Sequence, residues 1–119
     1  MLEVLFGSID KERVLQFILA KKTGYASQIA IFYGTKPSQI TKQLEALEEG
    51  GLLCSVQVGR TRLYSFNPRY FFTKELTELL IKARDTYEPD LKNRLLFERI
   101  RPRRKGKTYN KGTENEPII

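Results

Sequence analysis

The sequence predicts a mainly α-helical protein that carries one β-hairpin. Two changes of hydrophobic spacing support this prediction. Apolar residues recur every three to four positions before residue 50 and again after residue 73, whereas between residues 52 and 66 they alternate. At 119 residues, with 40% hydrophobic and 29% charged residues, the chain fits one soluble globular domain.

Two helices are expected in the first third of the chain. Residues 9–22 have helical spacing, Ser8 fits the N-cap, and Gly24 is expected to end this helix. A shorter helix follows in ASQIAIFYG, where Gly34 supplies the C-terminal stop. The side chains expected to face inward are Val14, Leu15, Ile18, Leu19, Ile29 and Phe32.

A third helix is expected after a turn of only three residues, 34–36. Pro37 suits its first turn, because the N–H group that proline lacks would have no partner there. Gly50 and Gly51 end the helix. One narrow apolar stripe is formed by Ile40, Leu44 and Leu47, and the residues off this stripe are mostly polar.

A β-hairpin is expected after the two glycines. Side chains alternate between two faces in LLCSVQV (52–58) and RTRLYSF (60–66), and Gly59 allows the tight turn between them. Pro68 ends the second strand, because proline cannot donate to a ladder. Tyr64 and Phe66 share one strand face and are expected in the core.

Two more helices and a basic tail complete the chain. Helical spacing returns at Thr73, breaks at EPD (88–90), and continues over about 90–100. We therefore expect a core at 1–70, C-terminal helices at 71–100 and a tail at 101–119. Residues 99–111 contain seven Lys or Arg and no acid, so the net charge of +7 belongs to this end. Such runs usually bind polyanions, and a role in solubility alone is the alternative.

Several function classes are disfavoured by composition. Cys54 is the only cysteine and there is no histidine, so intrachain disulfides, thiolate or imidazole metal sites and Ser-His or Cys-His catalysis lack their groups. The paired acids Glu48 with Glu49 and Glu75 with Glu78 fit solvated helix surfaces, so no enzyme is expected. No run is long and apolar enough to span a membrane, and the acidic N-terminus is unlike a secretory signal, which suggests a cytoplasmic protein.

The order of elements predicts a winged helix-turn-helix, in which the second helix of the pair enters the DNA major groove. The stretch IAIFYGTKPSQITKQLEALEEGGLL resembles the core of ArsR- and MarR-like bacterial regulators, and VGRTRLYSFNPRY is similar to their wing. The resemblance covers residues 9 to about 70. The positions that match the helix motif are Ser38, Thr41, Leu44, Leu47 and Gly51.

This resemblance implies a transcriptional regulator, a repressor or autoregulator, that binds double-stranded DNA as a homodimer. No cofactor is expected. Metal-sensing relatives use a cysteine pair on these helices, whereas residues 26–50 contain neither Cys nor His, so metal sensing is not expected. With MLEVLFGS at its start, GRTRLYSFNPRY in its wing and a basic C-terminus, the chain also resembles a small subgroup often encoded beside nucleotidyltransferase-type proteins. An antitoxin-like interaction module that docks such an enzyme is therefore the alternative.

The polar face of the third helix supplies candidate DNA contacts. Glutamine can pair with adenine, and lysine can reach guanine or phosphate. An ordinary solvated face is the alternative. Acids at the other end of the helix would repel phosphates, so contacts are expected only in its first two turns. The candidates are Lys36, Ser38, Gln39, Thr41, Lys42 and Gln43, and the acids are Glu45, Glu48 and Glu49.

Arginines outside the helix supply further candidates. Arg60 and Arg62 flank the hairpin tip, where a guanidinium can enter a narrow minor groove or hold a phosphate, and protection of the strand edge is the alternative. In the tail, each basic side chain that neutralises a phosphate steepens the salt dependence of binding. The tail candidates are Arg101, Arg103, Arg104 and Lys105.

A dimer interface is expected because one helix contacts only a few base pairs, and paired half-sites supply specificity. The candidate surface is the apolar face of the helix that begins near Thr73, with the N-terminal apolar residues as a possible addition. The alternative is that this face completes the domain core. The candidate residues are Leu76, Leu79, Leu80 and Ala83.

Overall fold

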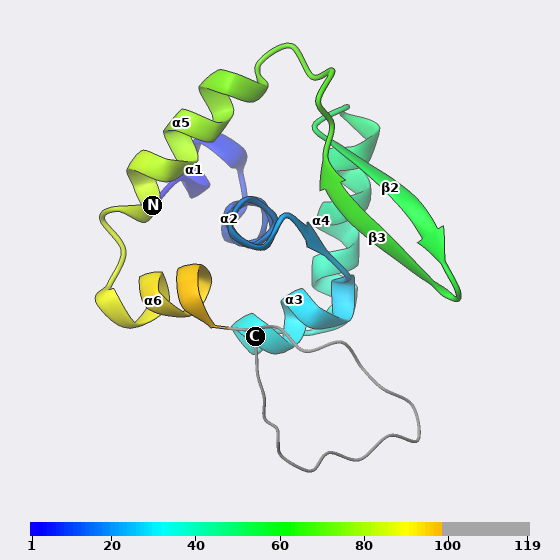
Figure 1. The fold of residues 1–119 in the computed structure, drawn as a ribbon, viewed down its shortest axis with the longest axis horizontal. Helices are drawn as coiled ribbons and strands as arrows, with labels where there is room; N and C mark the ends of the chain where they lie inside the picture. Colours follow the sequence, from blue (N-terminus) through cyan, green and yellow to red (C-terminus); the bar gives the residue numbers. More distant parts are fainter. Residues whose placement is uncertain (99–119) are drawn as a thin grey trace.

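The computed structural model describes residues 1–98, which form six helices and one small antiparallel sheet (Figure 1). The predicted fold class is confirmed: a winged helix-turn-helix followed by C-terminal helices. In chain order the elements are α1 (Glu3–Phe6), α2 (Ile9–Lys21), β1 (Thr23–Gly24), α3 (Ala26–Tyr33), α4 (Pro37–Glu49), β2 (Leu53–Val58), β3 (Thr61–Phe66), α5 (Thr73–Arg84) and α6 (Pro89–Phe97).

Helix α2 lies at the centre of the molecule, where Figure 1 views it nearly end-on with the other helices around it. The sequence predicted a single inward face, but all five side chains from Val14 to Ile18 are buried, while Leu19 is only partly covered. A helix that is packed on several sides buries side chains around its whole circumference. The buried amide of Gln16 donates from Nε2 to the Leu80 carbonyl oxygen at 2.8 Å. This bond ties α2 to α5. At the helix start, Ser8 accepts hydrogen bonds from two first-turn N–H groups, as predicted for an N-cap.

The prediction that Gly24 ends the first helix is wrong. Helix α2 ends at Lys21, and the Lys22 N–H group, in a residue with φ of 78°, donates to the Ile18 carbonyl oxygen. Gly24 instead lies buried in β1, a two-residue strand that pairs with β3 and was not predicted. A Cβ atom there would lie 3.1 Å from the side chains of Phe17 and Ile29, so glycine permits a close approach of the backbone.

Helices α3 and α4 form the predicted helix pair. Gly34 ends α3 with φ of 71°, and Pro37 occupies the first turn of α4. The predicted apolar stripe of α4 is confirmed, because its members Ile40, Leu44 and Leu47 are all buried. Ile29 and Phe32 of α3 are buried as predicted. The stripe fixes which side of α4 faces solvent.

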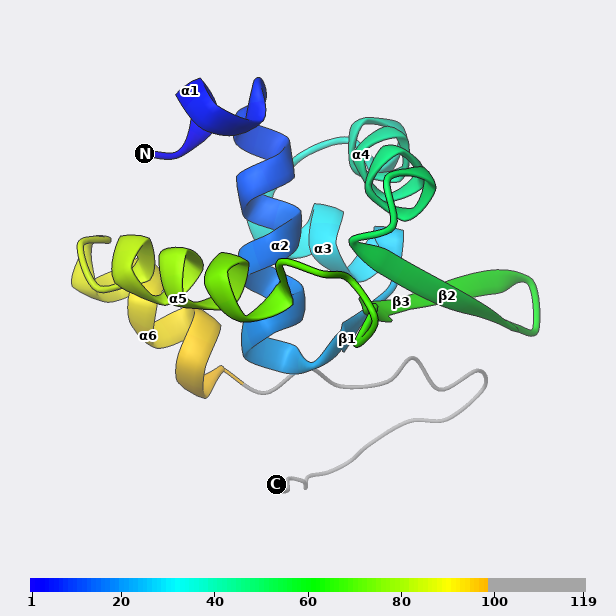
Figure 2. The same cartoon turned by 90° about the horizontal axis from the view of Figure 1, so that it is seen from above.

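The sheet has the strand order β1-β3-β2, and all its pairs are antiparallel. Val58 pairs with Thr61 across the two-residue loop, and Gly59 takes φ of 62° at its first position. Tyr64 is buried and Phe66 packs against the core, as predicted. Leu53, which pairs with Phe66, supplies the buried position of β2. In Figure 2 the hairpin projects beyond the helices, next to α4.

The C-terminal helices close the other side of α2. Helix α6 is predicted over about 90–100 and observed at Pro89–Phe97, with Leu95 fully buried. Arg94 holds this helix to α3: its guanidinium lies 4.2 Å from the Phe32 ring centre and donates to the Phe32 carbonyl oxygen at 2.8 Å. The remaining part of that prediction, from residue 99 onward, lies outside the described residues.

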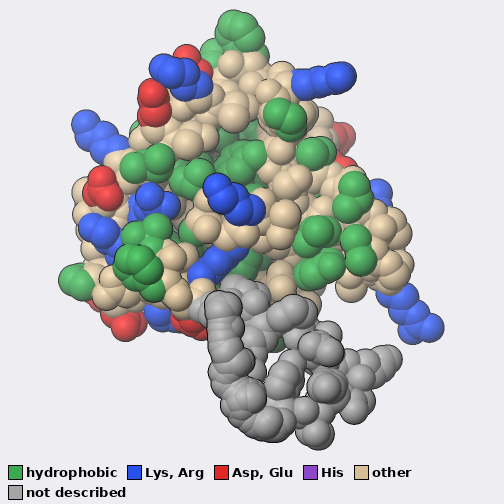
Figure 3. Space-filling view, in the orientation of Figure 1, with side chains coloured by type: hydrophobic (Ala, Val, Ile, Leu, Met, Phe, Trp, Pro, Cys, Tyr) green, Lys and Arg blue, Asp and Glu red, His purple; other side chains and the backbone are tan. Residues whose placement is uncertain are grey.

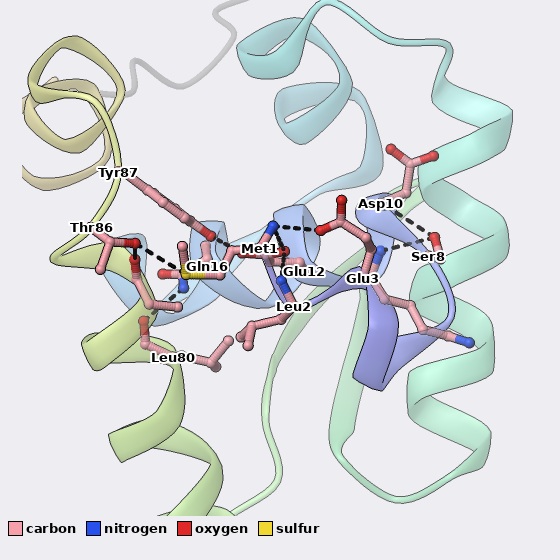
Figure 4. A network of polar contacts seen from close by, with 12 residues as sticks. Met1, Leu2, Glu3, Ser8, Asp10, Glu12, Gln16, Leu80, Thr86 and Tyr87 are labelled. Carbon is pink, nitrogen blue, oxygen red and sulfur yellow. Dashed lines mark hydrogen bonds and ion pairs between the residues drawn. The ribbon is translucent and has the colours of Figure 1, made fainter.

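A buried carboxylate connects the N-terminal segment to the rest of the molecule (Figure 4). Glu12 of α2 is 3% exposed and accepts a hydrogen bond from the Leu2 N–H group at 2.7 Å. The Tyr87 hydroxyl, from the turn between α5 and α6, donates to the same carboxylate. The short helix α1, which was not predicted, thus directly follows a residue that is fixed to the core.

Candidate nucleic-acid interface

The polar side of α4 is the first part of the candidate interface. Its buried stripe packs against α2 and α3, so the opposite side is turned to solvent. Of the predicted contact residues on this helix and its flank, four are exposed and two are half-buried. The exposed ones are Lys36, Ser38, Gln39 and Lys42, and the half-buried ones are Thr41 and Gln43.

One of these side chains already has a partner at the helix start. The Gln39 Oε1 atom accepts a hydrogen bond from the Lys36 N–H group at 3.4 Å. Pairing of a glutamine with adenine uses both its amide oxygen and its amide nitrogen. A contact of Gln39 with a base would therefore require the loss of this long capping bond, and the sequence pattern did not reveal that competition.

The hairpin is the second part of the candidate interface, and Figures 1 and 2 both place it beside α4. Arg60 lies at the tip and is exposed to solvent. Arg62, one strand position away from the loop, donates from Nη1 to the Gln57 Oε1 atom of β2 at 2.9 Å. The Thr61 hydroxyl donates to the Val58 carbonyl oxygen at 3.0 Å, which closes the loop. Arg60 thus belongs to the loop, and Arg62 to the hydrogen-bonded strand end beside it.

A hollow of about 300 Å³ separates α4 from the hairpin. It brings together side chains from α4, from the first turn of α3 and from β3, and it includes two of the predicted contacts, Thr41 and Arg62. The lining residues are Tyr25, Ala26, Ser27, Pro37, Thr41, Glu45, Thr61, Arg62 and Tyr64.

Sequence reasoning missed the contribution of α3 to this surface. Tyr25 and Ser27, at the start of α3, line the hollow although neither was a predicted contact. Ser27 stands in the first turn of a helix that the sequence predicted, and its polar, uncharged side chain on the first helix of the predicted pair was the available signal. Tyr25 could not be assigned from its position alone, because its place follows from the pairing of β1 with β3.

The acidic residues at the end of α4 have different surroundings. Glu48 accepts a hydrogen bond from the Ser55 hydroxyl at 2.7 Å and so turns toward β2. Glu45 lines the hollow, one helical turn after Thr41. Burial raises the pKa of Tyr64, Glu48 and Glu45 raise it further, and Arg62 opposes them. These charged groups therefore act together on Tyr64, which lines the hollow.

Apolar side chains gather on the outer face of the hairpin, at the right of Figure 3. Val56 and Val58 are 59% and 44% exposed. Neither residue lines the hollow. A wing with charged residues near its tip and valines along its outer face thus has two chemically different surfaces.

The predicted dimer surface is largely covered within the single chain. Leu76, Leu80 and Ala83 of α5 are buried in the core, which matches the alternative that this face completes the domain. Leu79 alone keeps substantial exposure, at 36%. Of the four predicted residues, only Leu79 thus offers apolar surface to a second copy.

The tail, metal sites and membrane spans were also subjects of prediction. Arg101, Arg103, Arg104 and Lys105 lie outside the described residues. Within residues 1–98, no three His, Cys, Asp or Glu side chains are grouped as a metal site would need. None of the helices in this range has the length and apolarity needed to cross a bilayer.

Comparison with known proteins supports the fold. The chain is similar to a solved structure of a double mutant of Lactococcus lactis ZitR in apo form, with a TM-score of 0.50 and 24% sequence identity. The match covers 80% of this chain and 76% of that chain. No family model matches the chain, and no curated protein matches it. At this identity the likeness establishes a shared fold, in agreement with the helix pair and hairpin described above.

Proposed function

We propose that the protein is a non-enzymatic, sequence-specific DNA-binding transcriptional regulator of the cytoplasm. The observation that carries this proposal is one hollow with Thr41 of α4 on one side and Arg62 of the hairpin on the other, beside the exposed polar residues of the first turns of α4. A helix and a hairpin arranged in this way match the major groove of duplex DNA and its flanking backbone. The similarity to ZitR supports the fold on which this surface is built.

In this proposal the parts of the surface have different roles. The first two turns of α4 enter the major groove, where Gln39 and Lys42 contact base edges and Ser38 contacts a phosphate. Arg60 and Arg62 contact the adjacent minor groove or its phosphates. The basic tail adds affinity for any duplex through counterion release. Base contacts thus set the preferred sequence, and the remaining contacts set the strength of binding.

The test is selection of duplexes from a random library by the full-length protein, followed by affinity measurements on the enriched sequence. The double variant Gln39→Ala, Lys42→Ala should lose roughly tenfold or more in preference for this sequence over random duplex, because base contacts are removed. Lys82→Ala, an exposed lysine of α5, is the matched control and should leave the preference unchanged. A preference that survives the double variant would overturn the assignment of α4.

We also propose that the regulator acts as a homodimer, since two half-sites give specificity that one helix cannot. The buried face of α5 is not available, so the candidates are exposed apolar residues such as Val4, Leu5 and Leu79, which are 89%, 66% and 36% exposed. Light scattering should give twice the monomer mass for the native chain and the monomer mass for Leu5→Glu. Ile31→Glu, at another exposed apolar position, is the control that should remain dimeric.

The alternative is a protein-interaction module that docks a nucleotidyltransferase-type enzyme. An exposed aromatic pair before α5 favours a protein contact outside the DNA surface: Phe71 and Phe72 are 86% and 53% exposed, with ring centres 4.9 Å apart. This alternative would be supported if a stoichiometric partner co-purifies by binding to these rings and the protein binds all duplexes with equal affinity. An enriched DNA sequence would support the regulator.

A further inference from the structure

Glu45 carries a negative charge on the side of α4 that holds candidate DNA contacts, where a residue that repels phosphates is not expected. Ser38, Lys42 and Glu45 are spaced by four and three residues, so they lie along one side of the helix. Ser38 and Lys42 are candidate DNA contacts, and all three residues are exposed. The rise of an α-helix is about 1.5 Å per residue, so seven residues span roughly 10 Å, which is about three base pairs.

The carboxylate of Glu45 is also available for a new contact. It lines the hollow together with Thr41 and Arg62. Two of the charged groups beside it have other partners: Glu48 accepts from Ser55, and Arg62 donates to Gln57. Among residues 1–98, no salt bridge neutralises Glu45. A bare carboxylate thus stands within the surface that would face DNA.

A carboxylate at this place of a helix in the major groove would distinguish between DNA sequences. It repels phosphates, and placing like charges together is costly wherever the groups lose water. In the major groove it can accept a hydrogen bond from an exocyclic amino group, and the N4 amino group of cytosine is the usual partner of an acidic side chain. A base pair with cytosine in reach offsets the repulsion, whereas one without it leaves the charge unpaired.

We propose that Glu45 is a specificity-determining residue that selects a cytosine in the half-site contacted by α4 and weakens binding to duplexes that lack it. The inference rests on the proposed function, because it requires α4 to enter the major groove. It changes the expectation from sequence that contacts stop after the first two turns of the helix. Specificity then comes from an unfavourable charge as well as from favourable contacts.

The test compares Glu45→Gln with Glu49→Gln, an exposed acid on the same helix that does not line the hollow. Each full-length variant, and the native protein, selects duplexes from a random library, and each is titrated with an unselected random duplex. Glu45→Gln should lose the cytosine preference at one position of the enriched motif, keep the preferences at the others, and bind random duplex roughly tenfold more tightly at low salt. This gain should shrink as salt screens the charge. Glu49→Gln should retain the native motif and change random binding by less than about twofold.

The outcomes separate this inference from the proposed function. If the native protein enriches no motif, the proposed function fails. If it enriches a motif that Glu45→Gln leaves unchanged at every position, the role of Glu45 is overturned, whatever the change in affinity for random duplex. Circular dichroism of both variants checks that α4 stays folded, which is expected because neither side chain belongs to the buried stripe.

Discussion

Gly24 lies where three elements approach one another. Its backbone pairs with Tyr64 of β3, and a Cβ atom would lie 3.1 Å from Phe17 of α2 and Ile29 of α3. The sequence suggested a helix stop, because glycine commonly performs that role near the end of a helical pattern. The two roles look the same in sequence, and only the neighbours supplied by the fold distinguish them.

Gly24→Ala should destabilise the protein by about 1 to 3 kcal/mol, because the added methyl group overpacks the contact between α2 and α3. The midpoint of urea unfolding measures the change. Gly50→Ala is the matched control, since Gly50 has φ of −79° and a Cβ there would meet its nearest neighbour at 3.5 Å. Equal losses for the two variants would argue against the close approach.

Tyr87 and Glu12 form a contact that depends on pH. Burial and the hydrogen bond to Glu12 both raise the pKa of Tyr87 above its ordinary value of 10.0. A raised pKa in the folded state means that the stabilisation is complete below about pH 10 and is lost as the pH rises further, because the phenol ionises first in the unfolded chain. Tyr33 acts in the same direction, since burial raises its pKa as well.

Tyr87→Phe should lower stability at pH 7 by about 1 kcal/mol, because Glu12 loses a donor while it stays buried. Above pH 10 the same variant should lose less stability per pH unit than the native protein, because one raised pKa has been removed. Denaturant titrations at pH 7 and through the range from pH 9 to 11 measure both effects. An unchanged alkaline slope would contradict the role of Tyr87.

At the scale of elements, the observed α4 and hairpin agree closely with those predicted from the sequence. The stripe of Ile40, Leu44 and Leu47 is buried as predicted, because a strong helical period has only one way to face a core. The hairpin matched because Gly59 has the positive φ that its loop position needs. Helix α2 departed from prediction, since a helix surrounded by others shows no single apolar face.

The hairpin should act as one binding element. Replacing Arg60 and Arg62 together with alanine should weaken binding to all duplexes and reduce the salt slope by up to about two units, because each phosphate contact contributes roughly one. Anisotropy titrations at several salt concentrations measure the slope. Arg69→Ala, an exposed arginine after β3 that lies outside the hollow, is the control. A slope unchanged in the double variant would favour the alternative that these arginines protect the strand edge.

At the scale of the whole molecule, charge is distributed unevenly. Residues 1–98 contain 14 Lys or Arg and 12 Asp or Glu, so most of the net charge of +7 lies after them. We therefore expect the described domain to determine which sequence is bound and the tail to add affinity that is independent of sequence.

Removal of residues 101–119 should weaken binding to every duplex and flatten the salt dependence by up to about one unit for each Lys or Arg removed. The ratio of affinities for the enriched and random duplexes should stay within about twofold of the native value. Thermal unfolding of the truncated chain checks that residues 1–98 remain folded. A salt slope equal to that of the native protein would show that the tail serves another purpose, such as solubility.

The sequence by itself determined the fold class, the helix pair, the hairpin and the exposed face of α4. These features follow from local rules: the period of apolar residues, the capping residues and the glycines that permit special backbone angles. The tertiary structure decided what depends on neighbours distant in the chain. It buried Leu76, Leu80 and Ala83 in the core, placed Gly24 against α2, and brought Glu45 into one hollow with Ser27 and Arg62. Burial and contact between separate elements depend on how those elements pack, and no local pattern in the sequence encodes that arrangement.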